Sequence, residues 1–122
     1  MARKILFVDD EPVVATLMKN RMESRGFSVE IANDGATALT IAKTWLPDFI
    51  LLDVIMPGMD GYETCRRLKA MPETAAIPVV LFTAVQETKM EILAKKAGAV
   101  QVVQKPFIDR VFKAIDEILG PE

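Results

Sequence analysis

Short, uninterrupted apolar runs restrict the fold of this chain more than any other feature of its sequence. The runs Ile5–Val8, Phe49–Leu52 and Val79–Phe82 are apolar at every position. A strand with one face in water alternates apolar and polar residues, whereas a strand covered on both faces is apolar throughout. These runs therefore predict the inner strands of a sheet with helices on both faces, and such sheets are almost always parallel.

Segments with helical spacing separate these runs from two further strand candidates, Val29–Ala32 and Val100–Val103. The expected helices lie over Pro12–Arg25, near Ala36–Thr44, from Asp60 onward, near Glu87–Ala97 and over Phe107–Leu119. Strict alternation of strand and helix predicts a doubly wound α/β sandwich with a five-stranded parallel sheet and five helices. Residues 1–122 have the size of one domain.

Apolar spacing and helix ends predict some local details. The buried face of the first helix is expected to carry Val14, Leu17, Met18 and Met22. Phe107 is expected to begin the apolar face of the last helix. Glu63 stands three residues after Asp60, which predicts a capping box at the start of the third helix.

Composition excludes several classes of function. A formal net charge of -2 and a pI near 5.2 give no basic field that could hold nucleic acid. No apolar stretch reaches the roughly eighteen residues of a membrane helix. The single cysteine, Cys65, fits a reducing compartment. We therefore expect a cytoplasmic protein that binds neither nucleic acid nor membrane.

The absence of histidine restricts the chemistry further. The sequence contains no histidine, which is the usual general base and the commonest transition-metal ligand. One cysteine cannot build a Cys-based metal cage. Any chemistry must therefore run on carboxylates, hydroxyls and lysine.

Polar groups suited to phosphate or metal chemistry follow most of the strand candidates. Asp9 and Asp10 follow the first strand, Asp53 the third, Thr83 the fourth and Lys105 the fifth. In doubly wound folds, ligands bind beyond the carboxyl ends of the strands, where the strand order reverses. If the order is 2-1-3-4-5, the first and third strands are neighbours and the three aspartates share one pocket.

Three carboxylates in one pocket repel one another unless a cation lies among them. Oxygen ligands without histidine or cysteine favour magnesium, with manganese or calcium as alternatives. With Lys105 and the Thr83 hydroxyl, such an ion would stabilise charge on a phosphoryl group moving in line to a carboxylate. Asp53 is the natural nucleophile, because a carboxylate can attack without first losing a proton.

Each of these residues also has an ordinary explanation when it is taken alone. Asp9 and Asp10 could cap the first helix, Asp53 could stand in a turn, and Thr83 could cap a helix. Lys105 could be a solvated surface lysine. Their joint arrival at the carboxyl ends of strands favours a common site for phosphoryl chemistry.

Four segments of the chain have the residues of a known family. They read PheValAspAspGlu, LeuAspValIleMetProGlyMetAspGlyTyrGlu, ThrAla and GlnLysProPhe. This pattern resembles the receiver domains of two-component response regulators, in particular the single-domain chemotaxis type, and the likeness covers nearly the whole chain. It implies the 2-1-3-4-5 strand order of a flavodoxin-like fold. It also implies a phosphorelay in which Asp53 takes the phosphoryl group from a phosphohistidine on a histidine kinase or a histidine phosphotransfer protein.

The resemblance implies a magnesium site, with manganese as an alternative ion. Asp10, Asp53 and the backbone carbonyl of Ile55 would bind the metal directly, and Asp9 would bind it through a water molecule. The chain would be no enzyme toward other substrates. It would catalyse only its own phosphorylation and dephosphorylation.

The resemblance also implies groups that hold the phosphoryl oxygens. These are Thr83, the backbone amide of Ala84 and Lys105. The peptide bond between Lys105 and Pro106 would be cis, a form largely confined to bonds before proline. We expect the phosphorylated state to be read by a partner protein that the sequence does not identify, or by a domain outside this chain.

The sequence departs from the family pattern at the switch position, and two further positions bear on the lifetime of the phosphorylated state. Receivers commonly carry Tyr or Phe three residues before the lysine and pair it with the threonine as a switch, but here Val102 accompanies Thr83. Ile55 and Val85 stand two residues after the acceptor and the threonine, beside the expected path of an attacking water. Neither side chain can hydrogen-bond a water, so slow dephosphorylation is predicted.

Three other functions fit parts of the sequence less well than the receiver. A magnesium-dependent aspartyl-phosphate hydrolase of the haloacid-dehalogenase type needs a second aspartate two positions after the first, where this chain has Ile55. A non-phosphorylated receiver-fold binding module usually lacks an acidic or lysine position, and this chain has them all. A flavin or nucleotide site would need a Gly- or Ser/Thr-rich loop after the first strand rather than AspAspGluPro.

Overall fold

Strands and helices alternate along the chain, as the computed structural model shows for residues 2–84 and 89–121. The strands are β1 (Lys4–Val8), β2 (Ser28–Ala32), β3 (Phe49–Leu52), β4 (Val79–Thr83) and β5 (Gln101–Gln104). The helices are α1 (Pro12–Glu23), α2 (Gly35–Trp45), α3 (Gly61–Ala70), α4 (Met90–Ala97) and α5 (Ile108–Leu119). The expected start of the fourth helix at Glu87 lies outside the described residues.

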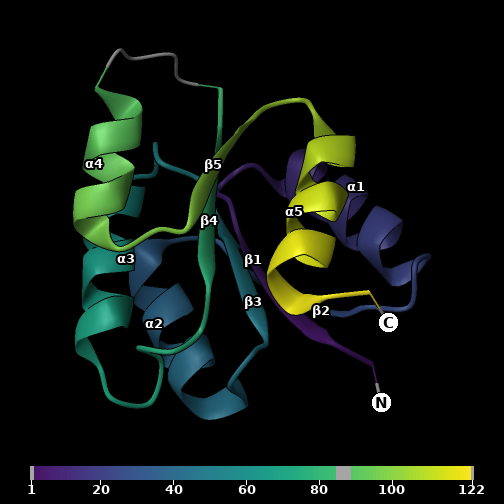
Figure 1. Cartoon of the computed structure of the whole chain (residues 1–122), viewed down its shortest axis with the longest axis horizontal. Coiled ribbons are helices and arrows are strands. Elements are labelled where there is room, and N and C mark those ends of the chain that lie inside the picture. The colour runs from purple at the N-terminus through teal and green to yellow at the C-terminus, as the bar shows by residue number, and fades with distance from the viewer. Residues whose placement is uncertain (1, 85–88, 122) are drawn as a thin grey trace.

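The strands form one parallel sheet in the order β2-β1-β3-β4-β5, which confirms the doubly wound topology (Figure 1). Chain direction is the same in every strand, so all carboxyl ends lie at one edge of the sheet. Val8 of β1 pairs with Leu52 of β3. The residues that follow them, Asp9 and Asp53, therefore leave two neighbouring strands at the same level.

Helices cover the two faces of the sheet, with α1 and α5 on one side and α2, α3 and α4 on the other (Figure 1). Alternate residues of the inner strands enter the two cores: Phe7 and Leu51 face α1 and α5, whereas Leu6 and Leu52 face the other helices. The two-sided burial explains why β1, β3 and β4 contain apolar residues without alternation. Within the described part of the chain, no helix is both long enough and apolar enough to cross a membrane.

The structure corrects two expected core positions. Leu17 of α1 is 59% exposed, although Met18 and Met22 of the same helix are buried as expected. Phe107 is 46% exposed and stands just before α5 as its N-cap residue, under the guanidinium of Arg110. Both misplacements arise at the edge of an apolar stripe, where helical spacing does not show how far the covering sheet extends.

The expected capping box at α3 is only half formed. The side chain of Asp60 accepts the backbone N–H of Glu63 at 2.8 Å, which is the expected cap. The Glu63 carboxylate does not return to Asp60 but bonds with Arg66 and Arg67 on the next turn. These two guanidinium groups hold the pKa of Glu63 below its usual value. Asp34 caps α2 in the same way through the N–H of Thr37.

Candidate functional site

Three acidic side chains meet at the carboxyl edge of the sheet. Asp9 and Asp10 follow β1, Asp53 follows β3, and each can place a carboxylate oxygen within 4.8 Å of the other two. Asp9 is fully buried, Asp53 is 5% exposed and Asp10 is exposed. Backbone bonds fix the level of the buried pair, because the N–H of Asp53 donates to Val8 and that of Asp9 to Ala32. The aspartate cluster predicted from the sequence therefore exists.

Lys105 brings a positive charge into this cluster from the end of β5. Its backbone N–H donates to the carbonyl of Thr83 at 2.9 Å, and its peptide bond to Pro106 is cis, as the resemblance implied. The ammonium Nζ lies 2.6 Å from Asp9 Oδ2 and 3.2 Å from Asp53 Oδ2. The Lys105 side chain is 14% exposed, so this is a largely buried ion triad rather than a surface contact.

Burial and neighbouring charges shift the pKa values of Asp53 and Lys105. Burial raises the pKa of Asp53, and the neighbouring Asp9 raises it further, while Lys105 partly offsets both effects. Burial alone would lower the pKa of Lys105, but its contacts with Asp9 and Asp53 outweigh burial and the pKa is raised. Lys105 therefore stays charged. Because Lys105 offsets only part of the effect of burial and of Asp9, Asp53 favours a bound proton or a nearby cation.

Hydrogen bonds fix the direction of the two buried carboxylates. Oδ1 of Asp53 accepts the backbone N–H of the next residue, Val54, at 2.8 Å, so Oδ2 faces Lys105. Oδ1 of Asp9 accepts the N–H of Glu11 at 2.9 Å. Each carboxylate thus has one oxygen held by the backbone and one directed into the shared pocket.

The donor set fits a hard divalent cation. Aspartate oxygens from Asp9, Asp10 and Asp53 converge, and no histidine or cysteine competes with them. Receiver domains bind Mg²⁺ at such an acidic pocket, and oxygen-only sites suit this ion. The exposure of Asp10 leaves the pocket open on one side, as a magnesium ion that keeps several water ligands requires.

The ordinary explanations of these residues find little support. The N-cap residue of α1 is Glu11, so neither Asp9 nor Asp10 occupies the capping position, although Asp9 accepts the backbone N–H of Glu11. The N-cap residue of α4 is Lys89 rather than Thr83. Lys105 is not a solvated surface lysine.

The remaining predicted site residues surround the triad at different depths. Thr83 ends β4 and is 1% exposed, one residue beyond the strand level of Asp53, whereas Ala84 after it is exposed. Ile55 is 64% exposed in the loop after the acceptor candidate. Val102 lies half-buried in β5. Val85 lies outside the described residues.

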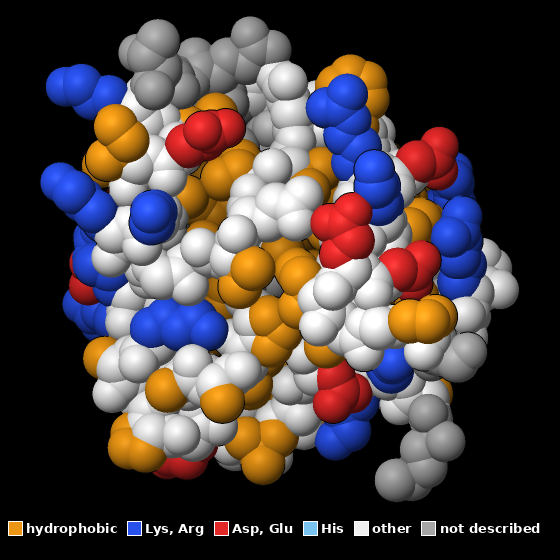
Figure 2. Space-filling view, viewed as in Figure 1, with side chains coloured by type: hydrophobic (Ala, Val, Ile, Leu, Met, Phe, Trp, Pro, Cys, Tyr) orange, Lys and Arg blue, Asp and Glu red, His pale blue; other side chains and the backbone are white. Residues whose placement is uncertain are grey.

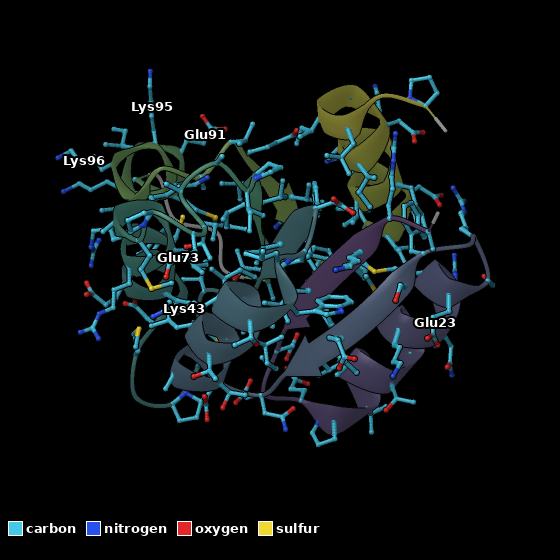
Figure 3. All side chains as sticks on the ribbon, turned by 90° about the horizontal axis from the view of Figure 1, so that it is seen from below. Glu23, Lys43, Glu73, Glu91, Lys95 and Lys96 are labelled. Carbon is cyan, nitrogen blue, oxygen red and sulfur yellow. The ribbon has the colours of Figure 1, made fainter. Side chains whose placement is uncertain are left out.

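A second concavity lies between α4 and β5, away from the triad. It has a volume of about 540 Å³ and is lined by Glu91, Ala94, Lys95, Ala99, Val100, Gln101 and Val102. Figure 2 shows apolar side chains between the α4 and α5 sides of this face, with basic groups on the α4 side. Figure 3 shows Lys95 and Lys96 extending from α4 away from the sheet, and Lys43 beside Glu73, its ion-pair partner at 3.5 Å.

Sequence reasoning missed one residue beside the site, Gly61. It is the first residue of α3, and its Cα faces the backbone of Asp53 closely enough to leave no room for a Cβ atom. The available signal was a glycine directly after the capping residue Asp60, a position where a helix gains nothing from glycine. The direct contact between Lys105 and Asp9 was also not foreseen.

The buried triad of Asp9, Asp53 and Lys105 lies at the carboxyl edge of a doubly wound sheet, where such folds bind their ligands. Residues 5–116 match the family model of the response regulator receiver domain. The chain therefore belongs to the response regulator receiver domain family of two-component signalling. Receiver domains are phosphoacceptors rather than enzymes acting on other substrates.

Relatives of known function support this membership. The chain is 44% identical to the response regulator PleD of Caulobacter vibrioides over 109 residues, which cover 89% of this chain and 24% of PleD. It is 39% identical to the alkaline phosphatase synthesis transcriptional regulatory protein PhoP of Bacillus subtilis, over 93% of this chain and 47% of PhoP. The chain thus spans a quarter to a half of the length of these relatives.

Solved structures show the same fold. Chemotaxis protein CheY4 of Vibrio cholerae superposes with a TM-score of 0.91 at 27% identity, covering 97% of this chain and 99% of CheY4. The signal receiver domain of a signal transduction histidine kinase from Syntrophus aciditrophicus superposes at 0.86 with 34% identity, covering 98% of this chain and 90% of that one. The flavodoxin-like, doubly wound prediction is confirmed.

Proposed function

We propose that Asp53 accepts a phosphoryl group from a phosphohistidine of a histidine kinase or histidine phosphotransfer protein. The observation that carries this proposal is the position of its carboxylate: 5% exposed, between two further aspartates and 3.2 Å from the Lys105 ammonium. Of the three clustered aspartates, Asp53 follows the middle strand, β3, and is largely desolvated but still reachable, whereas Asp9 is fully buried and Asp10 is exposed. Burial strips water from the carboxylate and so makes it a better nucleophile.

The transfer requires no acidic or basic group of this chain to donate or accept a proton. An oxygen of Asp53 forms a bond to phosphorus, the bond from phosphorus to the donor imidazole nitrogen breaks, and that nitrogen takes a proton from solvent. Lys105 stabilises the charge that develops on the phosphoryl oxygens, with the Thr83 hydroxyl and the backbone amide of Ala84 as further donors. Asp10, Asp53 and the Ile55 carbonyl would hold magnesium directly, and Asp9 would hold it through water. The ion, or manganese in its place, would supply positive charge near the same oxygens.

The chain would also promote its own dephosphorylation, but slowly. Hydrolysis needs a water in line with the phosphorus, and the side chain of Ile55 is apolar and 64% exposed in the loop after Asp53. Val85 is assigned the same role from the sequence. An apolar side chain offers no hydrogen bond that could hold an attacking water.

The phosphorylated state would be read by a partner protein through movement of Thr83 and the backbone that follows it. Val102 is half-buried, and its short β-branched side chain is restricted at χ1. It therefore cannot move between a buried and an exposed position as an aromatic ring could. Nucleic acid and membrane are not among the proposed partners, because the net charge is -2. A cytoplasmic location is part of the proposal and is supported by the free thiol of Cys65.

Intact-mass measurement tests the acceptor assignment. Wild-type protein incubated with acetyl phosphate and Mg²⁺ should gain one acid-labile phosphoryl group, and Asp53→Asn should gain none. Asp116→Asn is the matched control, since Asp116 is an exposed aspartate of α5 outside the cluster of Asp9, Asp10 and Asp53 and should leave the adduct unchanged. An undiminished adduct on Asp53→Asn would contradict the proposal.

A further inference from the structure

Gly61, the first residue of α3, lies against the backbone of the proposed acceptor. A Cβ atom on Gly61 would stand 2.2 Å from the carbonyl oxygen of Asp53 and 2.7 Å from the Cα of Val54. The backbone N–H of Gly61 donates to the carbonyl of Val54 at 2.8 Å. The φ of Gly61 is outside the left-handed region, so its conformation does not require glycine. What requires glycine here is space.

The peptide group between Asp53 and Val54 connects this contact to the carboxylate. Its carbonyl oxygen faces Gly61, and its N–H donates to Oδ1 of Asp53 at 2.8 Å. A peptide group is planar and moves as a unit, so a displacement of the carbonyl also displaces the N–H. Any residue larger than glycine at position 61 would therefore move the hydrogen bond that directs the Asp53 carboxylate toward Lys105.

We propose that Gly61 is a positioning residue for phosphoryl transfer: its bare Cα fixes the Asp53–Val54 peptide group and thereby aims both carboxylate oxygens of Asp53. The proposal rests on the proposed function, in which Asp53 accepts the phosphoryl group and helps to hold magnesium. Gly61 touches neither phosphoryl group nor metal. It acts through the backbone of the acceptor.

The chain offers a matched control in Gly35. Gly35 is the first residue of α2 and, like Gly61, directly follows an aspartate that caps its helix. A Cβ atom on Gly35 would stand 2.3 Å from the hydroxyl oxygen of Thr64 and 3.3 Å from side-chain atoms of Met59. Both glycines are thus closely packed at equivalent helix positions. They differ in what a Cβ atom would contact: the side chains of Thr64 and Met59 at Gly35, but the backbone of the acceptor at Gly61.

The comparison of Gly61→Ala with Gly35→Ala tests the proposal. We measure the melting temperature, the Mg²⁺ dissociation constant by titration calorimetry and the maximal rate of phosphorylation by acetyl phosphate. The Cβ contact in Gly61→Ala must open from 2.2 Å to at least 3.0 Å. A misplacement of about 1 Å can cost a reaction about 100-fold.

Both variants should melt below wild type, but only Gly61→Ala should lose about 100-fold in maximal rate and bind Mg²⁺ more weakly. Gly35→Ala should keep both values within about threefold of wild type, a change of less than 1 kcal/mol. A folded Gly61→Ala with wild-type rate and Mg²⁺ affinity overturns the proposal. So does an equal loss in Gly35→Ala, because both effects would then follow from packing alone.

A measurement on the wild-type chain keeps the test decisive if Gly61→Ala does not fold. In an NMR titration with Mg²⁺, the amide signals of Val54 and Gly61 should shift with one common midpoint, while the amide signal of Gly35 stays in place. A Gly61 amide signal that does not shift on addition of Mg²⁺ overturns the proposal. The failure of the proposed function would look different, because Asp53→Asn would then still acquire the phosphoryl group.

Discussion

Replacement of Lys105 by methionine would remove the ammonium group that contacts Asp9 and Asp53 while keeping the length of the side chain. The Asp9 side chain is fully buried and that of Asp53 is 8% exposed. Without Lys105, the three clustered carboxylates would share one pocket without the cation that Asp9 and Asp53 now contact. We expect Lys105→Met to be strongly destabilised in the absence of metal.

The magnitude follows from the burial of the pair. Loss of one partner of a buried ion pair costs about 3–5 kcal/mol. The lower value applies here, because the raised pKa of Asp53 allows it to take up a proton when its partner is lost. With an unfolding entropy of about 2.1 cal/mol/K per residue, each kcal/mol changes the melting temperature of a 122-residue chain by roughly 4 °C. The expected fall for Lys105→Met is therefore about 12 °C.

Thermal unfolding in the presence of a chelator measures this fall, and addition of Mg²⁺ should reverse most of it. Mg²⁺ at 100 times its dissociation constant would stabilise the folded state by about 2.7 kcal/mol. Lys113→Met is the matched control, because Lys113 is 78% exposed and 4.0 Å from Glu117. Its melting temperature should stay within about 2 °C of wild type. A metal-free Lys105→Met that melts with the control would refute the buried triad.

Other perturbations test the remaining parts of the account. Burial raises the pKa of Asp53, so the charge of this carboxylate opposes folding. Metal-free Asp53→Asn should therefore melt above wild type and respond less to Mg²⁺, and a lower melting temperature would contradict this. Ile55→Asn combined with Val85→Glu should speed decay of the aspartyl phosphate, and an unchanged decay would contradict the water-exclusion argument. NMR shift changes on phosphorylation should centre on the loops after β3 and β4; equal changes at Val102 and α5 would show that the valine switches. Burial raises the pKa of the Cys65 thiol from 9.0 to about 11, so the unfolded chain loses this proton first and stability falls between these pH values. Cys65→Ala should remove that part of the alkaline loss in urea unfolding, and parallel pH profiles would argue against it.

The fold could be predicted from the sequence to a large extent because two-sided burial leaves a plain pattern. The bounds of β3, Phe49–Leu52, agree with the prediction, since every position of that strand is buried. Helix faces were predicted less well. Leu17 and Phe107 fit the helical spacing but lie at the margin of the helix face that packs on the sheet. At such a margin, exposure depends on how far other segments of the chain extend over the side chain. Glu63 had two basic neighbours within reach, and local spacing did not show which partner it would choose.

The site could be predicted as a set of residues but not as a geometry. Strand ends brought Asp9, Asp53 and Lys105 together through topology alone. The shorter contact of Lys105 with Asp9 depends on side-chain rotamers, and the sequence carries no signal for these. The role proposed for Gly61 depends on the distance between two backbone segments, which only the packed structure shows.

Direct location of the phosphoryl group tests the central claim most closely. Borohydride reduces an aspartyl phosphate to homoserine, so wild-type protein phosphorylated with acetyl phosphate and Mg²⁺, reduced and digested, can be read by peptide mass spectrometry. The account expects homoserine at position 53, with aspartate unchanged at positions 9 and 10. Homoserine at either of those positions with intact Asp53 would contradict the assignment of the acceptor.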